Sequence, residues 1–229
     1  ASIAAAARRR KPRRNGPGLA ARLRSPDEPA TVPAMTADEY AAARHTLPEA
    51  GRWTELVAGV VVRHDEPDDV HGNVVLNLSR TIGGMIAGPG EVGFTALFDT
   101  GVVTATGPDS VRFPAVSLFP LGDGAGLFDD VGSVVTARTP EVVIEVTSTP
   151  SRRRDFAARI EELHAAGVRA VWAVDPEERA VTTVAVDDPV TIYTGDESPA
   201  DGLLRDFHAS VDDLFATPAW WHGGPPASA

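Results

Sequence analysis

Five side chains in this sequence have the type and the setting to take part in acid–base or metal chemistry. Glu145 lies within the almost wholly β-branched run 141–147, which predicts a buried strand. An ionised carboxylate inside such a strand is costly unless it is paired or bound to a metal, so Glu145 is expected to belong to a site. The other four side chains are Glu55, His71, Asp99 and Arg159.

Three of these four also have a plainer interpretation. Glu55 lies in a predicted hairpin, where carboxylates are commonly solvated. His71 lies near a predicted helix start, where a surface histidine is common. Arg159 follows Asp155 by four residues, which is the spacing of an ion pair on a helix surface. The sequence leaves the structural and the functional interpretation open for each of them.

The composition excludes several classes of chemistry. The chain has 229 residues, 43% of them hydrophobic and 23% charged, which predicts one main globular domain with a sizeable core. Because there is no cysteine, disulfides, thiolate zinc sites and cysteine nucleophiles are excluded, and a reducing compartment is expected. There is also no Gly-rich phosphate loop, nucleophile elbow or His-rich metal motif.

The charge is distributed unevenly along the chain. Residues 1–26 carry eight basic side chains and no acidic one, whereas the rest carries 13 basic and 32 acidic side chains, a net charge near −19. We therefore expect residues 1–34 to be a disordered basic extension, 35–216 to be the folded domain and 217–229 to be a tail in which Trp220 and Trp221 make a docking contact. An acidic domain repels phosphate backbones, so we expect weak DNA binding at best.

No apolar run approaches the roughly 18 residues that a membrane span needs, and no apolar stretch of a signal peptide follows the basic start. A cytoplasmic protein without a membrane partner is therefore the expectation.

The five side chains must be positioned by a series of short elements. Capping signals predict helices over 37–44, from Asp68 to Gly88, from Thr149 to Gly167, and from Ser210 to Phe215. Hydrophobic patterns predict a hairpin over 53–62, strands over 92–104, 111–119, 141–147 and 170–174, and a meander over 181–193. The strand–helix–strand order from residue 141 to 174 predicts a crossover unit. The fold class is therefore α/β, with a mixed central sheet flanked by helices.

Several segments together resemble the Uma-type restriction endonuclease family, a branch of the PD-(D/E)XK nuclease superfamily. The resemblance covers residues 35–216. It rests on Glu55 to Val61 of the hairpin, on His71 at the start of the long helix, on the motif Arg112-Phe113-Pro114, on residues 142–148, and on the run from Asp155 to Pro176.

The resemblance implies a restriction-endonuclease-like fold and Mg²⁺-dependent hydrolysis of phosphodiesters. In the family, carboxylates from a hairpin, from a Pro-Asp pair and from the next strand converge on the metal, and a helix lysine lies beside the attacking water. Hard Mg²⁺ prefers such oxygen ligands. Glu55 matches the hairpin carboxylate and Glu145 the central one, so the resemblance implies that Glu145, Glu55, Arg159 and His71 form the catalytic set.

Two positions depart from the family pattern. Ala115 stands where the family has the aspartate of Pro-Asp, and a methyl group cannot bind a metal. Arg159 stands where the family has the lysine. We therefore expect an impaired endonuclease, with Asp99 considered as a compensating metal ligand beside Glu145. The alternative is a non-catalytic binding or regulatory module, and a protein partner or a homodimer stays open.

Overall fold

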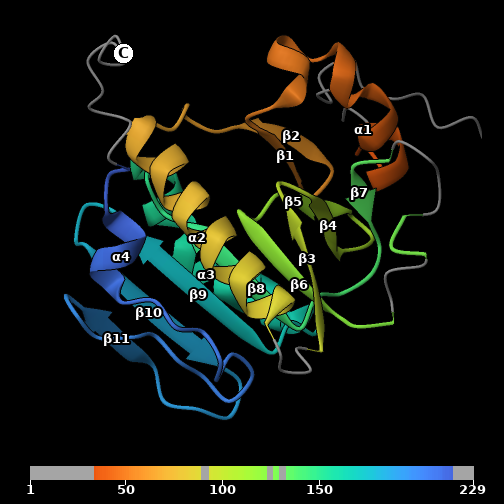
Figure 1. The fold of residues 1–229 in the computed structure, drawn as a ribbon. Coiled ribbons are helices and arrows are strands. Elements are labelled where there is room, and N and C mark those ends of the chain that lie inside the picture. Colours follow the sequence, from red (N-terminus) through yellow and green to blue (C-terminus); the bar gives the residue numbers. More distant parts are fainter. Residues whose placement is uncertain (1–33, 89–92, 123–125, 129–132, 219–229) are drawn as a thin grey trace, which may run out of the picture. The chain divides into compact units, whose positions relative to one another are not determined.

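The computed structural model describes residues 34–88, 93–122, 126–128 and 133–218, and its strands form two mixed sheets with helices packed against them (Figure 1). The first sheet has the strand order β2-β1-β5-β4-β7, and the second has the order β11-β10-β9-β8-β6-β3. This architecture confirms the predicted α/β class. It differs from the prediction in dividing the strands between two sheets.

The first sheet is built around the predicted hairpin. Its two antiparallel strands, β1 (Thr54–Val57) and β2 (Val60–Arg63), are joined by Ala58 and Gly59, both with positive φ, as a tight hairpin turn requires. The other strands are β4 (Gly101–Ala105), β5 (Ser110–Arg112) and β7 (Val135–Thr136).

The second sheet contains the predicted crossover unit. Strand β8 (Val142–Val146) leads through helix α3 (Pro150–Ala165) to the parallel strand β9 (Ala170–Asp175). The remaining strands are β3 (Phe94–Phe98), β6 (Val116–Pro120), β10 (Ala180–Ala185) and β11 (Thr191–Thr194).

Two helices cover opposite faces of the second sheet. Helix α2 (Asp69–Ala87) packs Leu78 and Ile82 against a core that includes Ile144. Helix α3 packs Leu163 against Val143 from the other side. Alternate residues of β8 therefore face different helices, which places Glu145 on the α3 side of the sheet.

The predicted helix starts are confirmed. Thr36 and Glu39 form a reciprocal capping box for α1 (Ala37–Ala43), and Ser210 with Asp213 forms a second one for α4 (Val211–Phe215). Asp68 caps α2, and Thr149 caps α3. Two short 3₁₀ segments, η1 (Arg44–Thr46) and η2 (Pro48–Gly51), connect α1 to β1.

Two predicted strands are wrong in their extent, because in both places the chain passes from one sheet to the other. The segment 92–104 breaks at Asp99, whose φ of 47° turns the chain from β3 into β4. The segment 111–119 breaks at residues 113–115, between β5 and β6. Asp99 consequently lies in a turn between two sheets and not within a strand, and β7 was not predicted at all.

The predicted docking contact of Trp220 and Trp221 lies outside the described residues, as do residues 1–33 of the basic extension. None of the helices in the described part of the chain has the length and apolar character needed to cross a membrane.

Candidate functional site

Residues from both sheets and from α3 meet in a buried ion cluster. Its members are Glu55 on β1, His64 just after β2, Arg112 on β5, Glu145 on β8, and Arg159 and Glu162 on α3. The side chains of Glu55 and Glu145 are 1% and 2% exposed. Two carboxylates that are far apart in the sequence are thus enclosed in the same interior region.

The guanidinium group of Arg159 joins the two carboxylates. It donates two hydrogen bonds to Glu55, from Nη1 to Oε2 at 2.7 Å and from Nη2 to Oε1 at 2.5 Å, and a third from Nε to Glu145 Oε1 at 2.6 Å. This geometry uses the planar fork of arginine, which a lysine ammonium group cannot reproduce. Arg159 therefore pairs across the sheets and not with Asp155.

Further donors complete the hydrogen bonding of the Glu55 carboxylate. Arg112 Nη1 donates to Glu55 Oε2 at 3.2 Å, and the backbone N–H of Phe113 donates to Oε1 at 2.9 Å. The ring Nε2 of His64 lies 2.9 Å from Oε2. Arg112 also binds Glu162 through both carboxylate oxygens. Glu55 is therefore a fully partnered buried carboxylate, and the interpretation as a solvated hairpin residue is wrong.

The pKa shifts agree with this pairing. Burial alone would raise the pKa of Glu55, but Arg159 and the hydrogen bond from His64 outweigh it and hold the pKa of Glu55 well below its usual range. Burial disfavours the charged form of Arg159, yet Glu145 and Glu55 raise its pKa further above that of a free arginine. Both groups are consequently ionised at neutral pH.

The cluster does not fit a divalent metal. Arg159 already occupies the space between the two carboxylates that match the family's metal ligands. The carboxylates of the cluster already face Arg112 and Arg159, and Arg152 approaches Glu145 at 3.5 Å from the edge of the cluster, so a divalent ion would add uncompensated charge. Within the described residues, no group of three His, Cys, Asp or Glu side chains could hold a metal ion.

A separate cavity lies beside the cluster, with Ala115 in its wall. We call it the Ala115 cavity; its volume is about 210 Å³, and its main polar lining residues are Arg52, His71, Asp99 and Arg152. The side chain of Ala115, the residue that the resemblance aligns with the family's aspartate, contributes only a methyl group to this wall.

His71 and Asp99 face this cavity and are not members of the ion cluster. Burial and the nearby Arg152 lower the pKa of His71 to about 4, so the ring is neutral at neutral pH; its Nδ1 lies 2.9 Å from Ser148 Oγ. Burial raises the pKa of Asp99, although Arg44, Arg152 and Arg52 act in the opposite direction.

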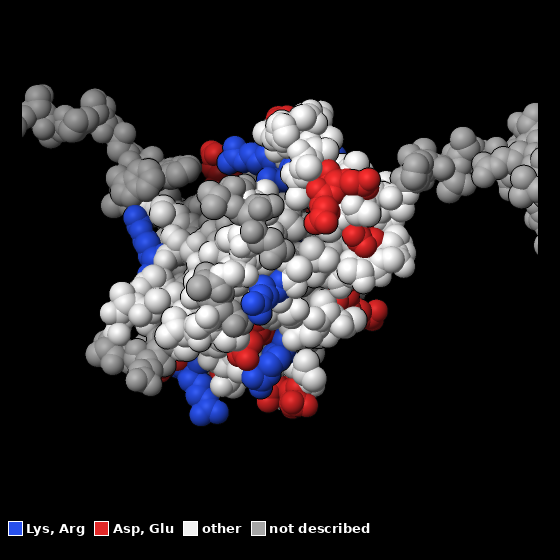
Figure 2. Space-filling view, turned by 90° about the vertical axis from the view of Figure 1, so that its right-hand side faces the viewer, with Lys and Arg blue, Asp and Glu red and all other residues white. Residues whose placement is uncertain are grey.

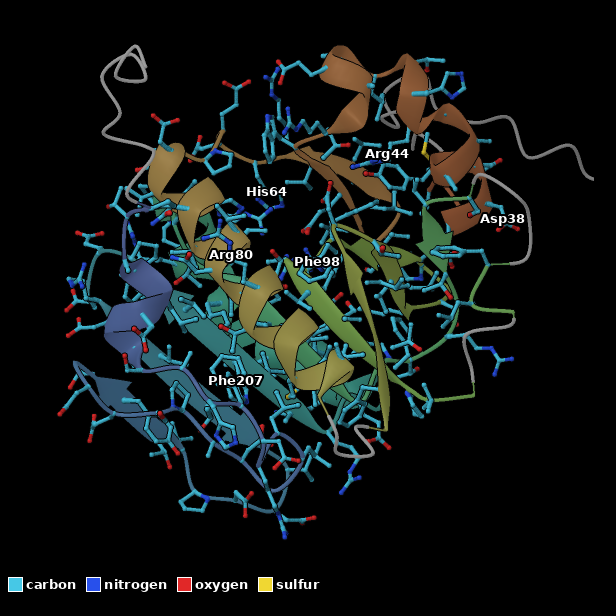
Figure 3. All side chains as sticks on the ribbon, viewed as in Figure 1. Asp38, Arg44, His64, Arg80, Phe98 and Phe207 are labelled. Carbon is cyan, nitrogen blue, oxygen red and sulfur yellow. The ribbon has the colours of Figure 1, made fainter. Side chains whose placement is uncertain are left out.

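The structure adds residues that sequence reasoning missed, namely His64, Arg112, Arg152 and Glu162. Helical spacing could have indicated two of them, because Arg152 and Glu162 lie seven residues before and three after Arg159 and so share a face of α3. Arg112 lay within the motif used for the resemblance. No sequence signal indicated His64, which reaches Glu55 through the register of the hairpin. Figure 3 labels His64, which directly follows β2, and Phe98, which ends β3.

Comparisons with known proteins agree with the fold. The sequence profile of the Uma2 family, described as "Putative restriction endonuclease", matches residues 38–211. A solved structure of a "putative nuclease belonging to DUF820" from Anabaena variabilis is similar, with a TM-score of 0.61 and 19% sequence identity over 79% of this chain and 97% of that one. No curated protein matches the chain.

The match spans most of the chain, so this protein belongs to the Uma2 family of restriction-endonuclease-like proteins. The similarity to the Anabaena protein shows a shared fold.

Proposed function

We propose that this protein is a non-catalytic member of its nuclease family, with Arg159 occupying the place of the family's metal ion. The observation that carries the proposal is the bidentate pairing of Arg159 with Glu55 combined with its Nε hydrogen bond to Glu145. A metal could bind these carboxylates only if a buried, triply bonded guanidinium were first displaced.

The second support is the absence of the carboxylate that the family's Pro-Asp pair would supply. The side chain of Ala115 offers no oxygen, and Asp99 lies in the wall of the cavity and outside the cluster. Removing one preorganised group commonly lowers a catalytic rate by about 10²- to 10³-fold. Losing a metal-bridging carboxylate should lower the rate by at least as much, and the arrangement in which a metal activates water is lost with it.

The direct test is nicking of supercoiled plasmid by the full chain with Mg²⁺ or Mn²⁺, next to a Glu145→Ala variant. We expect no cleavage above the level of the variant. Cleavage by the natural sequence that disappears in Glu145→Ala would overturn the proposal and would favour a rebuilt active site in which Asp99 assists Glu145.

A double variant, Ala115→Asp with Arg159→Lys, makes the test sharper. It restores the missing carboxylate and replaces the guanidinium by a compact ammonium group, so calorimetry should detect Mn²⁺ binding by the double variant and none by the natural sequence. Each single variant should bind less Mn²⁺ than the pair, because the two groups act as one unit.

The surface charge favours a module that does not hold nucleic acid through its folded domain. On the face shown in Figure 2, basic and acidic side chains lie in small separate groups with uncharged surface between them. Together with the net charge near −19 from residue 27 onward, this predicts that DNA binding depends on the basic segment 1–26. The salt dependence of DNA binding, measured by fluorescence anisotropy, should fall when the eight basic residues of this segment are replaced by glutamine.

A further inference from the structure

We propose that the Ala115 cavity binds a small organic oxyanion, a phosphate monoester or a carboxylate attached to a single flat apolar ring, without a metal. The inference rests on the proposed function, because it requires that the neighbouring carboxylates are already neutralised by Arg159 and do not repel an anion. It assigns a ligand to the part of the former active site that the ion cluster leaves open.

The cavity has donors that the protein itself does not use. Arg152, in the first turn of α3, has a side chain that is only 12% exposed, and its one ionic contact with the residues that the structure describes is the 3.5 Å approach of Nη1 to Glu145. Its Nε atom is buried and has no hydrogen-bond partner within the described part of the chain. Arg152 also lines the cavity, so a guanidinium group with few partners inside the protein lies beside the space that an anion would enter.

Other charges around the cavity favour the same ligand. Arg52 is exposed at its rim, and Arg44 lies behind the wall, with its guanidinium carbon 4.1 Å from the centre of the ring of the lining residue Phe113. The first turns of α2 and α3 both contribute to the lining, and the partial positive charge of these helix starts also attracts anions. The neutral ring of His71 adds no charge.

The walls determine the organic part of the ligand. Trp53, Phe98 and Phe113 are aromatic, and Val75, Pro114 and Ala115 complete an apolar surface around the charged end. A volume of about 210 Å³ has room for one substituted ring, since a cavity of roughly 150 Å³ in another protein takes up benzene. The cavity is too small for a folded macromolecular segment.

Asp99 is the one acidic group in this lining, and it provides a sharp test of the charge argument. Its carboxylate opposes an anion, and burial has already raised its pKa. Replacement by asparagine keeps the shape and removes the charge. Asp99→Asn should therefore tighten binding by about threefold, the effect of one unit charge several ångströms away in a partly solvated site.

The experiment is isothermal titration of the full chain in EDTA with phenyl phosphate, benzoate, inorganic phosphate and phenol as probes. Phenyl phosphate or benzoate should bind saturably at one site, and the stronger of the two shows which oxyanion the cavity prefers. Inorganic phosphate and phenol should each bind at least about tenfold more weakly, because each lacks one half of the interaction.

Variants connect the binding to the cavity. Arg152→Gln should weaken binding of the preferred probe by about tenfold or more, the loss of one charge-assisted hydrogen bond. Arg52→Gln, at an exposed rim position, should weaken it by less and leaves the fold intact. Arg154→Gln, an exposed arginine on the same helix outside the lining, is the matched control and should bind like the natural sequence.

Absence of saturable binding, or equal affinity in the natural sequence, Arg52→Gln and Asp99→Asn, would overturn the inference. Because the titration contains no metal, its failure is independent of the plasmid test. Loss of binding would leave the non-catalytic proposal intact, whereas Glu145-dependent nicking would refute that proposal whatever the titration shows.

Discussion

The ion cluster and the Ala115 cavity are neighbours, joined by the contact of Arg152 with Glu145, and they differ in how completely their charged groups are paired. In the cluster, every carboxylate has a cationic partner, and Glu55 alone accepts hydrogen bonds from two arginines and a backbone N–H. In the cavity, Arg152 keeps a buried donor without a partner, and Asp99 is not held by any ion pair among the described residues.

The difference follows from the side chains at positions 159 and 115, which lie in separate places. An arginine at position 159 is long and planar enough to bind two carboxylates at once, so it closes the space between them. An alanine at position 115 removes volume and charge, so it leaves an opening. We infer that one substitution has turned a binding site into a structural element and the other has left a cavity free for a different ligand.

The largest effect is expected from removing the central guanidinium. Arg159→Met leaves Glu55 and Glu145 buried without their main partner, and breaking such a pair on one side commonly costs about 3–5 kcal/mol. Urea unfolding at pH 7 should show a loss of this order. Arg154→Met on the exposed side of α3 is the control and should stay within about 0.5 kcal/mol of the natural sequence. Equal stabilities of the two variants would mean that the cluster does not hold the sheets together.

The two carboxylates should differ in their contribution to stability. Glu55→Gln removes the acceptor of several charged donors, whereas Glu145→Gln removes one short hydrogen bond and one long contact. We expect a loss of about 3 kcal/mol for the first change and roughly half as much for the second, measured by urea unfolding at pH 7. The reverse order would contradict the central place of Glu55.

The acid sensitivity of the protein should depend on Glu55. Folding lowers the pKa of Glu55. The stability that this residue contributes is therefore present above its pKa in the unfolded chain, about 4.3, and is lost as the pH falls through its lower pKa in the folded protein. In Glu55→Gln, the decline of the urea midpoint below about pH 4.3 should be shallower than in the natural sequence. Parallel curves would show that other carboxylates dominate acid unfolding.

His71 in the cavity should produce a pH effect in a different window. Folding lowers its pKa from about 6.5 to about 4, so the unfolded chain takes up the proton first as the pH falls. The stability associated with the neutral ring is complete above about pH 6.5 and declines toward pH 4, by on the order of 2 kcal/mol. His71→Asn should lack this decline, and its urea midpoint between pH 7 and 4.5 should be flatter.

The smallest effect on stability is expected from replacing Arg152, although this residue lies two turns from Arg159 on the same face of α3. Its contact with Glu145 is 3.5 Å long, so Arg152→Gln should change the free energy of unfolding by less than about 1 kcal/mol. A loss comparable to that of Arg159→Met would place Arg152 within the ion cluster and would leave the cavity without its free donor.

Most individual elements could be predicted from the sequence, because their signals lie within a few residues. Thr36 with Glu39, Asp68 and Ser210 mark helix starts that the structure confirms, and Ala58-Gly59 marks the hairpin turn. The two interrupted strands were not recognisable, since the residues on both sides of Asp99 and of residues 113–115 are equally suited to strands. Only the packing of two sheets decides where the chain leaves one and enters the other.

The sequence by itself determined that Glu145 needs a partner, because a carboxylate within an apolar strand cannot remain ionised alone. It also determined that residue 115 has no side-chain oxygen that could bind a metal. It did not determine which partner Glu145 has. The tertiary structure alone decided that Arg159 binds Glu55, 104 positions earlier in the chain, in preference to Asp155 one turn away. The reason is physical: a buried bidentate contact forms only where two sheets and a helix bring its groups together, and no local spacing encodes that meeting.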